Sequence, residues 1–406
     1  MSDVFARLGV KTIINANGPA TRLSGGLMRP EVASAMAEAS ARCVEIVDLQ
    51  AAASKVIADA TGAEAGYVTS GAAAGLLLAT AATIAGLDAA AMDRLPDTRG
   101  LKNQVIVARS QRNMYDHAVR TAGARLVEVG LPDRFAGSGV RDAEPWDYAA
   151  AITDKTAAIY YVAAPGSQPA LADVVAIARE HGVPVIVDAA AQLPPLSNLK
   201  RFIDDGADLV AFSGGKAIGG PQASGMLAGR RDLIMSAALQ QLDMDVDRHT
   251  WSPPPSLIDL ERLAGIPRHG IGRPCKVGKE QIAGLITALQ MTFAEEADGR
   301  LAARWQTLAE RLAAGLGDVD WADVSVVADS TGSGVPVVHM AVDANRADAD
   351  DVKLALERGE PSIHSNPDYR GTGLIVFGVT CLADDDPDRI AAAVKGLGNQ
   401  VMTGAR

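Results

Sequence analysis

The segment 184–224 reads PVIVDAAAQLPPLSNLKRFIDDGADLVAFSGGKAIGGPQAS and decides the fold class. It contains two short apolar runs, at 185–187 and 209–212, with a segment of helical character between them. Short apolar runs that end in polar residues or glycine are typical of buried parallel strands. We therefore predict an α/β protein built on a mostly parallel sheet.

Each of these two predicted strands leads into a chemically useful side chain. The first ends on Asp188, and the second leads into Ser213-Gly214-Gly215-Lys216. Ligands of open α/β sheets bind beyond the carboxyl ends of the strands, so Asp188 and Lys216 should face one crevice. Taken singly, Asp188 could be a turn residue and Lys216 a solvated side chain. Together they favour a pyridoxal phosphate site, because a lysine amine forms a Schiff base with an aldehyde and a buried carboxylate keeps the pyridine nitrogen protonated.

The motifs VDAAAQLPP and AFSGGKAIGGPQASGML resemble those of fold-type I pyridoxal phosphate enzymes. The resemblance is to the selenocysteine-synthase-like branch, which includes the D-glucosaminate-6-phosphate ammonia-lyase family, and it extends from INANGPAT to HGIGRPCKVGKEQIAGL. It implies a large domain with a mostly parallel seven-stranded sheet flanked by helices, and a smaller C-terminal α/β domain. We expect an N-terminal arm and helices at 1–55, the large cofactor-binding domain at 56–255 and the small domain at 256–406. The proline-rich segment DMDVDRHTWSPPP marks the second boundary.

Composition excludes several classes of protein. The chain has 406 residues, enough for two domains, and a net charge of −11, which argues against a nucleic-acid partner. Its three cysteines have no CxxC spacing, so we expect neither a metal site nor a disulfide framework. The start, MSDVFARLGVKT, lacks the apolar core of a signal peptide, and no run of 18 apolar residues is present. We expect a cytoplasmic protein with no membrane contact.

The segment GYVTSGAAAGLLLATAATIAG predicts a strand at 67–69, a glycine-containing turn and a long helix of small residues. The free amides at a helix N-terminus, together with the helix dipole, form a binding site for phosphate. We assign Ser70, Gly71, Ala72 and Ala73 to this site, mostly through main-chain atoms. Further strands are predicted at 104–109, 125–130 and 157–164 in this half of the chain.

Three more side chains are candidates for contact with the cofactor. Ser213, just before the glycines and Lys216, is placed to bind the phosphate through its hydroxyl. The resemblance implies that Gln192 hydrogen-bonds the ring oxygen and that His117 lies against the ring or near the substrate, where its imidazole could relay protons. A histidine in the first turn of a helix is also commonly a surface residue. The catalytic candidates are Lys216, Asp188 and His117.

Candidates for binding the substrate come from three other segments. Asn17, with 24–26, lies in an irregular N-terminal segment that the resemblance places at the substrate pocket. Arg273 belongs to a basic cluster with Lys276 and Lys279. Basic side chains at a helix start oppose the helix dipole, which indicates a bound anion, although a solvated helix start is the alternative.

The resemblance also implies that Arg273 lies near the active site, and that an arginine of the small domain binds the substrate carboxylate. Arg370 is the candidate for the second role, because a planar guanidinium binds carboxylates in a bidentate manner. An exposed turn residue is the alternative reading of Arg370. The resemblance further implies a homodimer or a higher homo-oligomer.

The activity that the resemblance favours is a lyase that carries out α,β-elimination on a hydroxylated amino acid or an amino sugar acid. Lys216 would remove the Cα proton, and loss of the β-hydroxyl would lead to a ketoacid and ammonia. A racemase or epimerase, an aldolase and a transaminase share the same first steps, and the sequence leaves these alternatives open. A protein that binds the cofactor without catalysis is the alternative from a different class.

Overall fold

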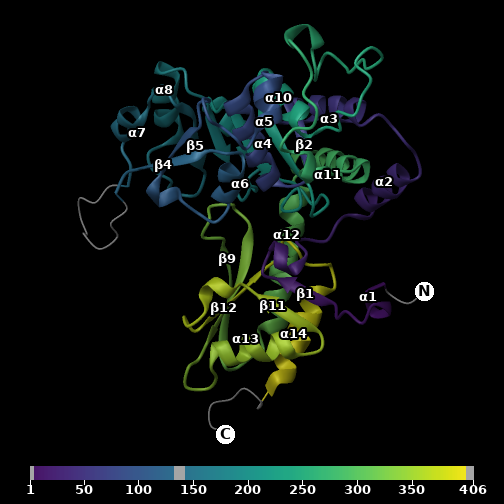
Figure 1. Ribbon diagram of the computed structural model, residues 1–406. Coiled ribbons are helices and arrows are strands. Elements are labelled where there is room, and N and C mark those ends of the chain that lie inside the picture. The colour runs from purple at the N-terminus through teal and green to yellow at the C-terminus, as the bar shows by residue number, and fades with distance from the viewer. Residues whose placement is uncertain (1–3, 132–141, 399–406) are drawn as a thin grey trace. The chain divides into compact units, whose positions relative to one another are not determined.

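The computed structural model describes residues 4–131 and 142–398, and the chain divides into two compact units (Figure 1). The larger unit is Arg29–Gln290, and the smaller unit combines Met1–Met28 with Met291–Arg406. This division does not coincide with the expected boundaries at 55/56 and 255/256. Strand β1 (Ile13–Ala16) pairs in parallel with β11 (Ser362–Ser365), so the N-terminal segment belongs to the C-terminal fold. The second boundary falls within helix α11 (Lys279–Ala297) rather than at the proline-rich segment.

The larger unit is built on a seven-stranded sheet of order β2-β8-β7-β6-β5-β3-β4. Strand β8 is antiparallel to both of its neighbours, and the other pairs are parallel. This confirms the predicted mostly parallel sheet, although β8 itself had no signal in the sequence that we recognised. The strands are β2 (Ala65–Thr69), β3 (Gln104–Ala108), β4 (Arg125–Val129), β5 (Thr156–Val162), β6 (Val185–Asp188), β7 (Leu209–Ser213) and β8 (Gly225–Gly229).

Helix α4 (Ala72–Ala85) is the central helix of this unit. It packs on the sheet, and α10 (Arg231–Gln241) packs on α4, so nearly all of its side chains are buried. A helix that is apolar on every side is stable only in such a position. The remaining helices are α2 (Pro30–Ser40), α3 (Ile46–Thr61), α5 (Ala89–Arg94), α6 (Asp116–Thr121), α7 (Pro145–Ala151), α8 (Leu171–Glu180) and α9 (Asn198–Asp204). In the described part of the chain, no helix is both long and apolar enough to span a bilayer.

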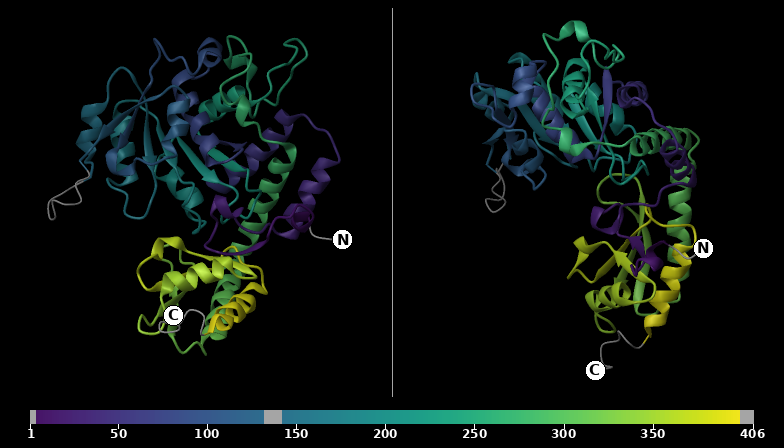
Figure 2. Two further views of the ribbon diagram at one scale, coloured as in Figure 1. Left: turned by 60° about the horizontal axis from the view of Figure 1, so that its bottom comes forward. Right: turned by 45° about the vertical axis from the view of Figure 1, so that its right-hand side comes forward.

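The smaller unit has its own core around a three-stranded antiparallel sheet of order β12-β10-β9. Figure 2 shows the purple strand β1 within this yellow-green unit, beside β11. Helices α12 and α14 pack against each other, and α12 packs on β10. The elements are α1 (Val4–Arg7), α12 (Arg300–Leu316), β9 (Ala322–Ala328), β10 (Pro336–Val342), α13 (Ala349–Arg358), β12 (Leu374–Gly378) and α14 (Asp386–Leu397).

Helix α3 protects the open edge of strand β2. The Gln50 side chain donates to the carbonyl of Val68 and accepts from its amide, at 2.9 and 3.0 Å. One turn later, the Ser54 hydroxyl accepts from the amide of Gly66 at 3.0 Å. Edge strands expose unpaired backbone groups, and side chains at i and i+4 of one helix satisfy three of them here. A Cβ at Gly66 would clash with Ile57, so glycine is required for this close approach.

We expect Gln50→Leu to lower the free energy of unfolding by about 2–4 kcal/mol, because a buried backbone amide and carbonyl would lose their partner. Gln50 has no exposed surface, so water does not replace it. Urea unfolding followed by circular dichroism checks this. The matched control is Gln306→Leu on an exposed face of α12, which should change stability by no more than about 0.5 kcal/mol. Equal effects of the two substitutions would contradict the role of Gln50.

Candidate active site

Asp188 ends strand β6 in the middle of the sheet and is only 7% exposed. It pairs with Val162 of β5 on one side and Ala211 of β7 on the other. Its Oδ1 accepts from the amide of Ala190 at 3.0 Å, and its Oδ2 accepts from the hydroxyl of Tyr160 at 3.0 Å. Burial raises the pKa of the Asp188 carboxyl, while these two donors and the charge of Lys216 oppose that rise.

Lys216 lies in the turn that follows β7 and is half-buried. Burial lowers the pKa of its amine, and the charge of Asp188 acts in the opposite direction. The turn approaches other backbone so closely that a Cβ at Gly215 would lie 2.6 Å from the Cα of Gln222. The glycines before Lys216 are therefore needed for the path of the chain. An amine and a carboxylate thus lie at neighbouring strand ends, close enough to affect each other's ionisation.

The turn between β2 and α4, called the cradle below, is a helix N-terminus of the kind that can bind an anion. Gly71 has a φ of 147°, which favours glycine, and as the N-cap residue it supplies no side chain to cap the helix that it begins. Behind this turn lies Gly225, which pairs with Thr69 of β2 on one side and Ser213 of β7 on the other. A Cβ on Gly225 would lie 2.5 Å from the carbonyl carbon of Gly71 and 2.7 Å from the nitrogen of Ala72. The bare backbone of β8 therefore lets the helix N-terminus sit directly on the sheet.

A chain of hydrogen bonds fastens a distant loop to this cradle. The Ser70 hydroxyl donates to the carbonyl of Cys275 at 3.1 Å. The same carbonyl accepts from Nε2 of Gln241 at 2.8 Å, and Oε1 of Gln241 accepts from the hydroxyl of Tyr67 at 2.6 Å. Cys275 takes part through its main-chain carbonyl. The basic loop 273–279 is thereby held beside Ser70.

Two members of the basic cluster in this loop have carboxylate partners. Arg273 forms an ion pair with Asp243 at 2.6 Å, and Lys279 pairs with Glu280. Backbone hydrogen bonding and Arg273 both lower the pKa of Asp243. Within 4–131 and 142–398, no carboxylate forms an ion pair with Lys276, which is exposed. The neighbouring carboxylates thus offset much of the positive charge that indicated a bound anion.

The other predicted residues are found in more open positions. His117 is exposed on α6, and its carbonyl accepts from the hydroxyl of Thr121. Gln192 is half-buried in the loop after β6. Asn17 and Arg370 belong to the smaller unit, and the Arg370 side chain is 86% exposed, 3.9 Å from Asp350. Contact of these four residues with a ligand stays a prediction.

Three polar residues at the site were missed in the sequence. Tyr160 donates to Asp188, and the nearby Asn113 side chain acts to lower the pKa of the Tyr160 hydroxyl. Asp116 on α6, only 2% exposed, acts on that hydroxyl through its charge and pairs with two arginines. The signal available was weak: a tyrosine in a fully buried strand needs a partner for its hydroxyl. Which partner it finds depends on strand order, which the sequence does not state.

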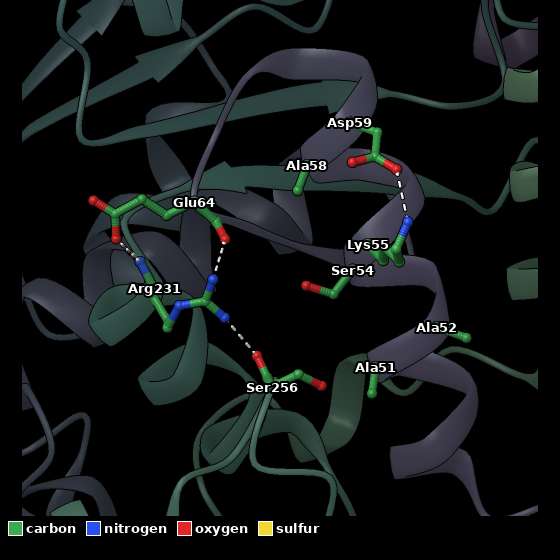
Figure 3. A pocket seen from close by; sticks show the side chains of 9 residues that line it. All are labelled: Ala51, Ala52, Ser54, Lys55, Ala58, Asp59, Glu64, Arg231 and Ser256. Atoms are coloured by element: carbon green, nitrogen blue, oxygen red, sulfur yellow. Dashed lines mark hydrogen bonds and ion pairs between the residues drawn. The ribbon is translucent and has the colours of Figure 1, made fainter.

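A separate hollow of about 500 Å³ lies between α3 and the segment that carries Ser256 (Figure 3). Arg231, which follows β8, spans it and donates to the carbonyls of Glu64 and Ser256 at 2.8 Å. Strand β8 is antiparallel to β2 and β7, so its carboxyl end lies beside their amino ends. The hollow is therefore at the opposite ends of the strands from Asp188 and Lys216. Its charged side chains have partners within the hollow: Lys55 pairs with Asp59 at 3.2 Å, and the Glu64 carboxylate accepts from the amide of Arg231. It is not part of the candidate site.

The groups at the carboxyl ends of the parallel strands fit pyridoxal phosphate. The α4 N-terminus offers amides to a phosphate, Asp188 offers a buried acceptor for a protonated ring nitrogen, and Lys216 offers an amine for an aldehyde. Among the residues that the structure describes, no three His, Cys, Asp or Glu side chains lie close enough to hold a metal ion.

Comparison with known proteins shows what the whole chain is similar to. Residues 45–248 match the model of the family SelA: L-seryl-tRNA selenium transferase. The chain is 33% identical to a 5'-C-glycyluridine monooxygenase-decarboxylase of Streptomyces sp over 97% of its length and 91% of the relative. It is 30% identical to the D-glucosaminate-6-phosphate ammonia lyase of Salmonella typhimurium (strain 14028s / SGSC 2262) over 97% and 98%. A solved structure of a D-glucosaminate-6-phosphate ammonia-lyase matches with a TM-score of 0.79 and 28% identity, covering 99% of both chains.

We expect Gly225→Ala to weaken the binding of pyridoxal phosphate by about tenfold or more, because the added Cβ pushes the Gly71–Ala72 amides out of the cradle. Fluorescence titration of the apoprotein measures the Kd. Pyridoxal, which lacks the phosphate, should bind the variant and the parent equally well. Gly265→Ala is the control, because a Cβ there meets no atom within 4 Å. Equal losses for pyridoxal and pyridoxal phosphate would contradict a phosphate cradle at this turn.

Proposed function

The chain belongs to the L-seryl-tRNA selenium transferase (SelA) family, and from this premise we propose that it is a pyridoxal-phosphate-dependent ammonia-lyase of a hydroxylated amino acid or an amino sugar acid. The observation that supports the proposal is that Asp188, Lys216 and the α4 N-terminus all lie at the carboxyl ends of the parallel strands. The match to the ammonia-lyase, in sequence and in structure, supports the reaction class. A racemase or epimerase and an aldolase are the alternative reactions.

Each residue of the site has a defined task in this proposal. Bound pyridoxal phosphate withdraws electrons from the carbon that carries the substrate amine, which weakens the bonds to that carbon. Asp188 holds a proton on the ring nitrogen, and the amides at the start of α4 hold the phosphate. Lys216 is suited to take the Cα proton, because burial lowers the pKa of its amine and favours the neutral form. His117 is our candidate for protonating the leaving hydroxyl.

We infer a small-molecule substrate rather than a tRNA, because a net charge of −11 disfavours binding of a polyanion. Ser70, Ala73, Ser213 and Gln192 complete the proposed cofactor site. Asn17, Arg273 and Arg370 are the proposed substrate contacts. A homodimer or higher homo-oligomer in the cytoplasm completes the proposal, and gel filtration with an activity assay on the fractions tests the assembly.

An oxygen-dependent decarboxylation is the second candidate function. The observation that favours it is the 33% identity to the monooxygenase-decarboxylase over 97% of this chain. The two reactions differ in their products, because elimination releases ammonia without consuming oxygen. An oxygen electrode and an assay for carbon dioxide distinguish them on the same substrates.

The first test is incubation of the purified protein with D-glucosaminate 6-phosphate and a panel of D- and L-hydroxyamino acids. We expect ammonia and a ketoacid in equal amounts from at least one of them, and a loss of at least about 1,000-fold in kcat for Lys216→Ala. A dehydrogenase-coupled ammonia assay measures both. Substrate turnover without ammonia but with oxygen uptake would favour the second candidate. Full activity in Lys216→Ala would contradict the proposed site.

The rate of cofactor uptake should report the ionisation of Lys216. The neutral amine is the form that bonds to the aldehyde, and a lowered pKa means that this form is present at a lower pH. We therefore expect the uptake rate to rise with pH. The midpoint of this rise should lie at a pH below the ordinary lysine pKa of about 10.4. Asp188→Asn should move the midpoint further down, because the carboxylate stabilises the ammonium. Stopped-flow absorbance with the apoprotein checks both directions, and a midpoint at the ordinary value would contradict the burial effect.

A further inference from the structure

The carboxylate of Asp188 is buried at the centre of the sheet, where an unaided carboxyl group takes up a proton. Its two oxygens have one donor each. The donor to Oδ1 is the amide of Ala190, which any residue at that position would supply. The donor to Oδ2 is the hydroxyl of Tyr160, which only this side chain supplies. The tyrosine is therefore the part of the arrangement that depends on the sequence.

We propose that Tyr160 is a positioning residue for Asp188, whose buried hydroxyl keeps this carboxylate ionised and oriented toward the ring nitrogen of bound pyridoxal phosphate. This inference rests on the proposed function and goes beyond it. It assigns to Tyr160 a role that acts through Asp188. Its action is carried by the single hydrogen bond of 3.0 Å to Oδ2.

Strand register fixes this contact. Asp188 pairs with Val162, and Tyr160 lies two residues before Val162 on the same strand, hence on the same face as Asp188. A diagonal neighbour in a sheet is within reach of an aromatic side chain. Tyr161 points to the opposite face, where its hydroxyl donates to the carbonyl of Pro169 at 3.2 Å. The hydroxyls of these adjacent tyrosines thus donate to different groups on opposite faces of the strand, and only that of Tyr160 reaches Asp188.

The groups around the pair support the direction of the effect. Tyr160 has no exposed surface, and burial is the main reason that its pKa is raised, so the hydroxyl keeps its proton and remains a donor. The charge of Asp116 also raises this pKa, while the nearby Asn113 side chain opposes the rise. Lys216 faces Asp188 from the turn after β7 and favours its ionised form. Loss of the tyrosine hydroxyl therefore moves the ionisation of Asp188 to higher pH.

The test is the pH dependence of pyridoxamine 5'-phosphate binding to the apoprotein, measured by fluorescence titration from pH 5 to 9. This probe has no aldehyde and does not bond to Lys216. Its own phosphate titrates in the same range, so the part of the acid limb that is lost in Asp188→Asn reports Asp188. We expect Tyr160→Phe to shift the midpoint of this limb to higher pH by about one unit. The affinity should then be about tenfold weaker at the acid end of the profile and unchanged at its alkaline end. Thermal melting of each variant confirms folding.

Two comparisons separate positioning from a general loss of packing. Tyr161→Phe removes one buried hydrogen bond from the same strand and should leave the profile in place. In an Asp188→Asn background, Tyr160→Phe should have no further effect on the limb. An unchanged limb in Tyr160→Phe, or an equal shift in Tyr161→Phe, would overturn the inference while the cofactor assignment stands. A parent protein that binds neither this probe nor pyridoxal phosphate would overturn both.

Discussion

The hydrogen bonds and the opposite charge around the buried carboxylate of Asp188 are the interactions on which the candidate site of the larger unit depends. A charge at the centre of a sheet is tolerated only where donors and an opposite charge compensate for the water that it has lost. Strand β5 supplies the hydroxyl of Tyr160, the loop after β6 supplies the amide of Ala190, and the turn after β7 supplies Lys216. Three neighbouring strands therefore have to keep their order and register for these partners to reach this one group.

A second constraint is the close approach of backbone to backbone at the other side of the site. Gly225 lies between Thr69 and Ser213 in the sheet, and the turn at Gly71 rests directly on it. The helix that begins there is buried along nearly its whole length between the sheet and α10, which its small side chains allow. The composition reflects this packing, since 40 glycines accompany an aromatic content of only 4%. The position of the turn at Gly71 thus depends on the absence of a side chain at Gly225.

The relatives of this chain carry names of different reactions, yet their similarity extends over most of its length. This agrees with a site in which one set of residues binds the cofactor and another set selects the reaction. In the proposed function, Asp188, Lys216 and the α4 N-terminus bind the cofactor, whereas the bond that breaks depends on the groups around the substrate. The loop 273–279 is attached to Ser70 through Cys275, and its Arg273 is held by Asp243. A substrate anion that reached Arg273 would compete with this carboxylate.

The sequence by itself determined the α/β class, the strands that end at Asp188 and Ser213, and the helix that begins after Gly71, because apolar runs and glycines act over a few neighbouring residues. Only the tertiary structure decided that β8 enters between β2 and β7, that the segment 13–16 pairs with 362–365, and that the hydroxyl of Tyr160 meets Asp188. These contacts join segments that are distant along the chain. Their partners are set by strand order and register, which follow from the packing of the whole unit and leave no local pattern in the sequence.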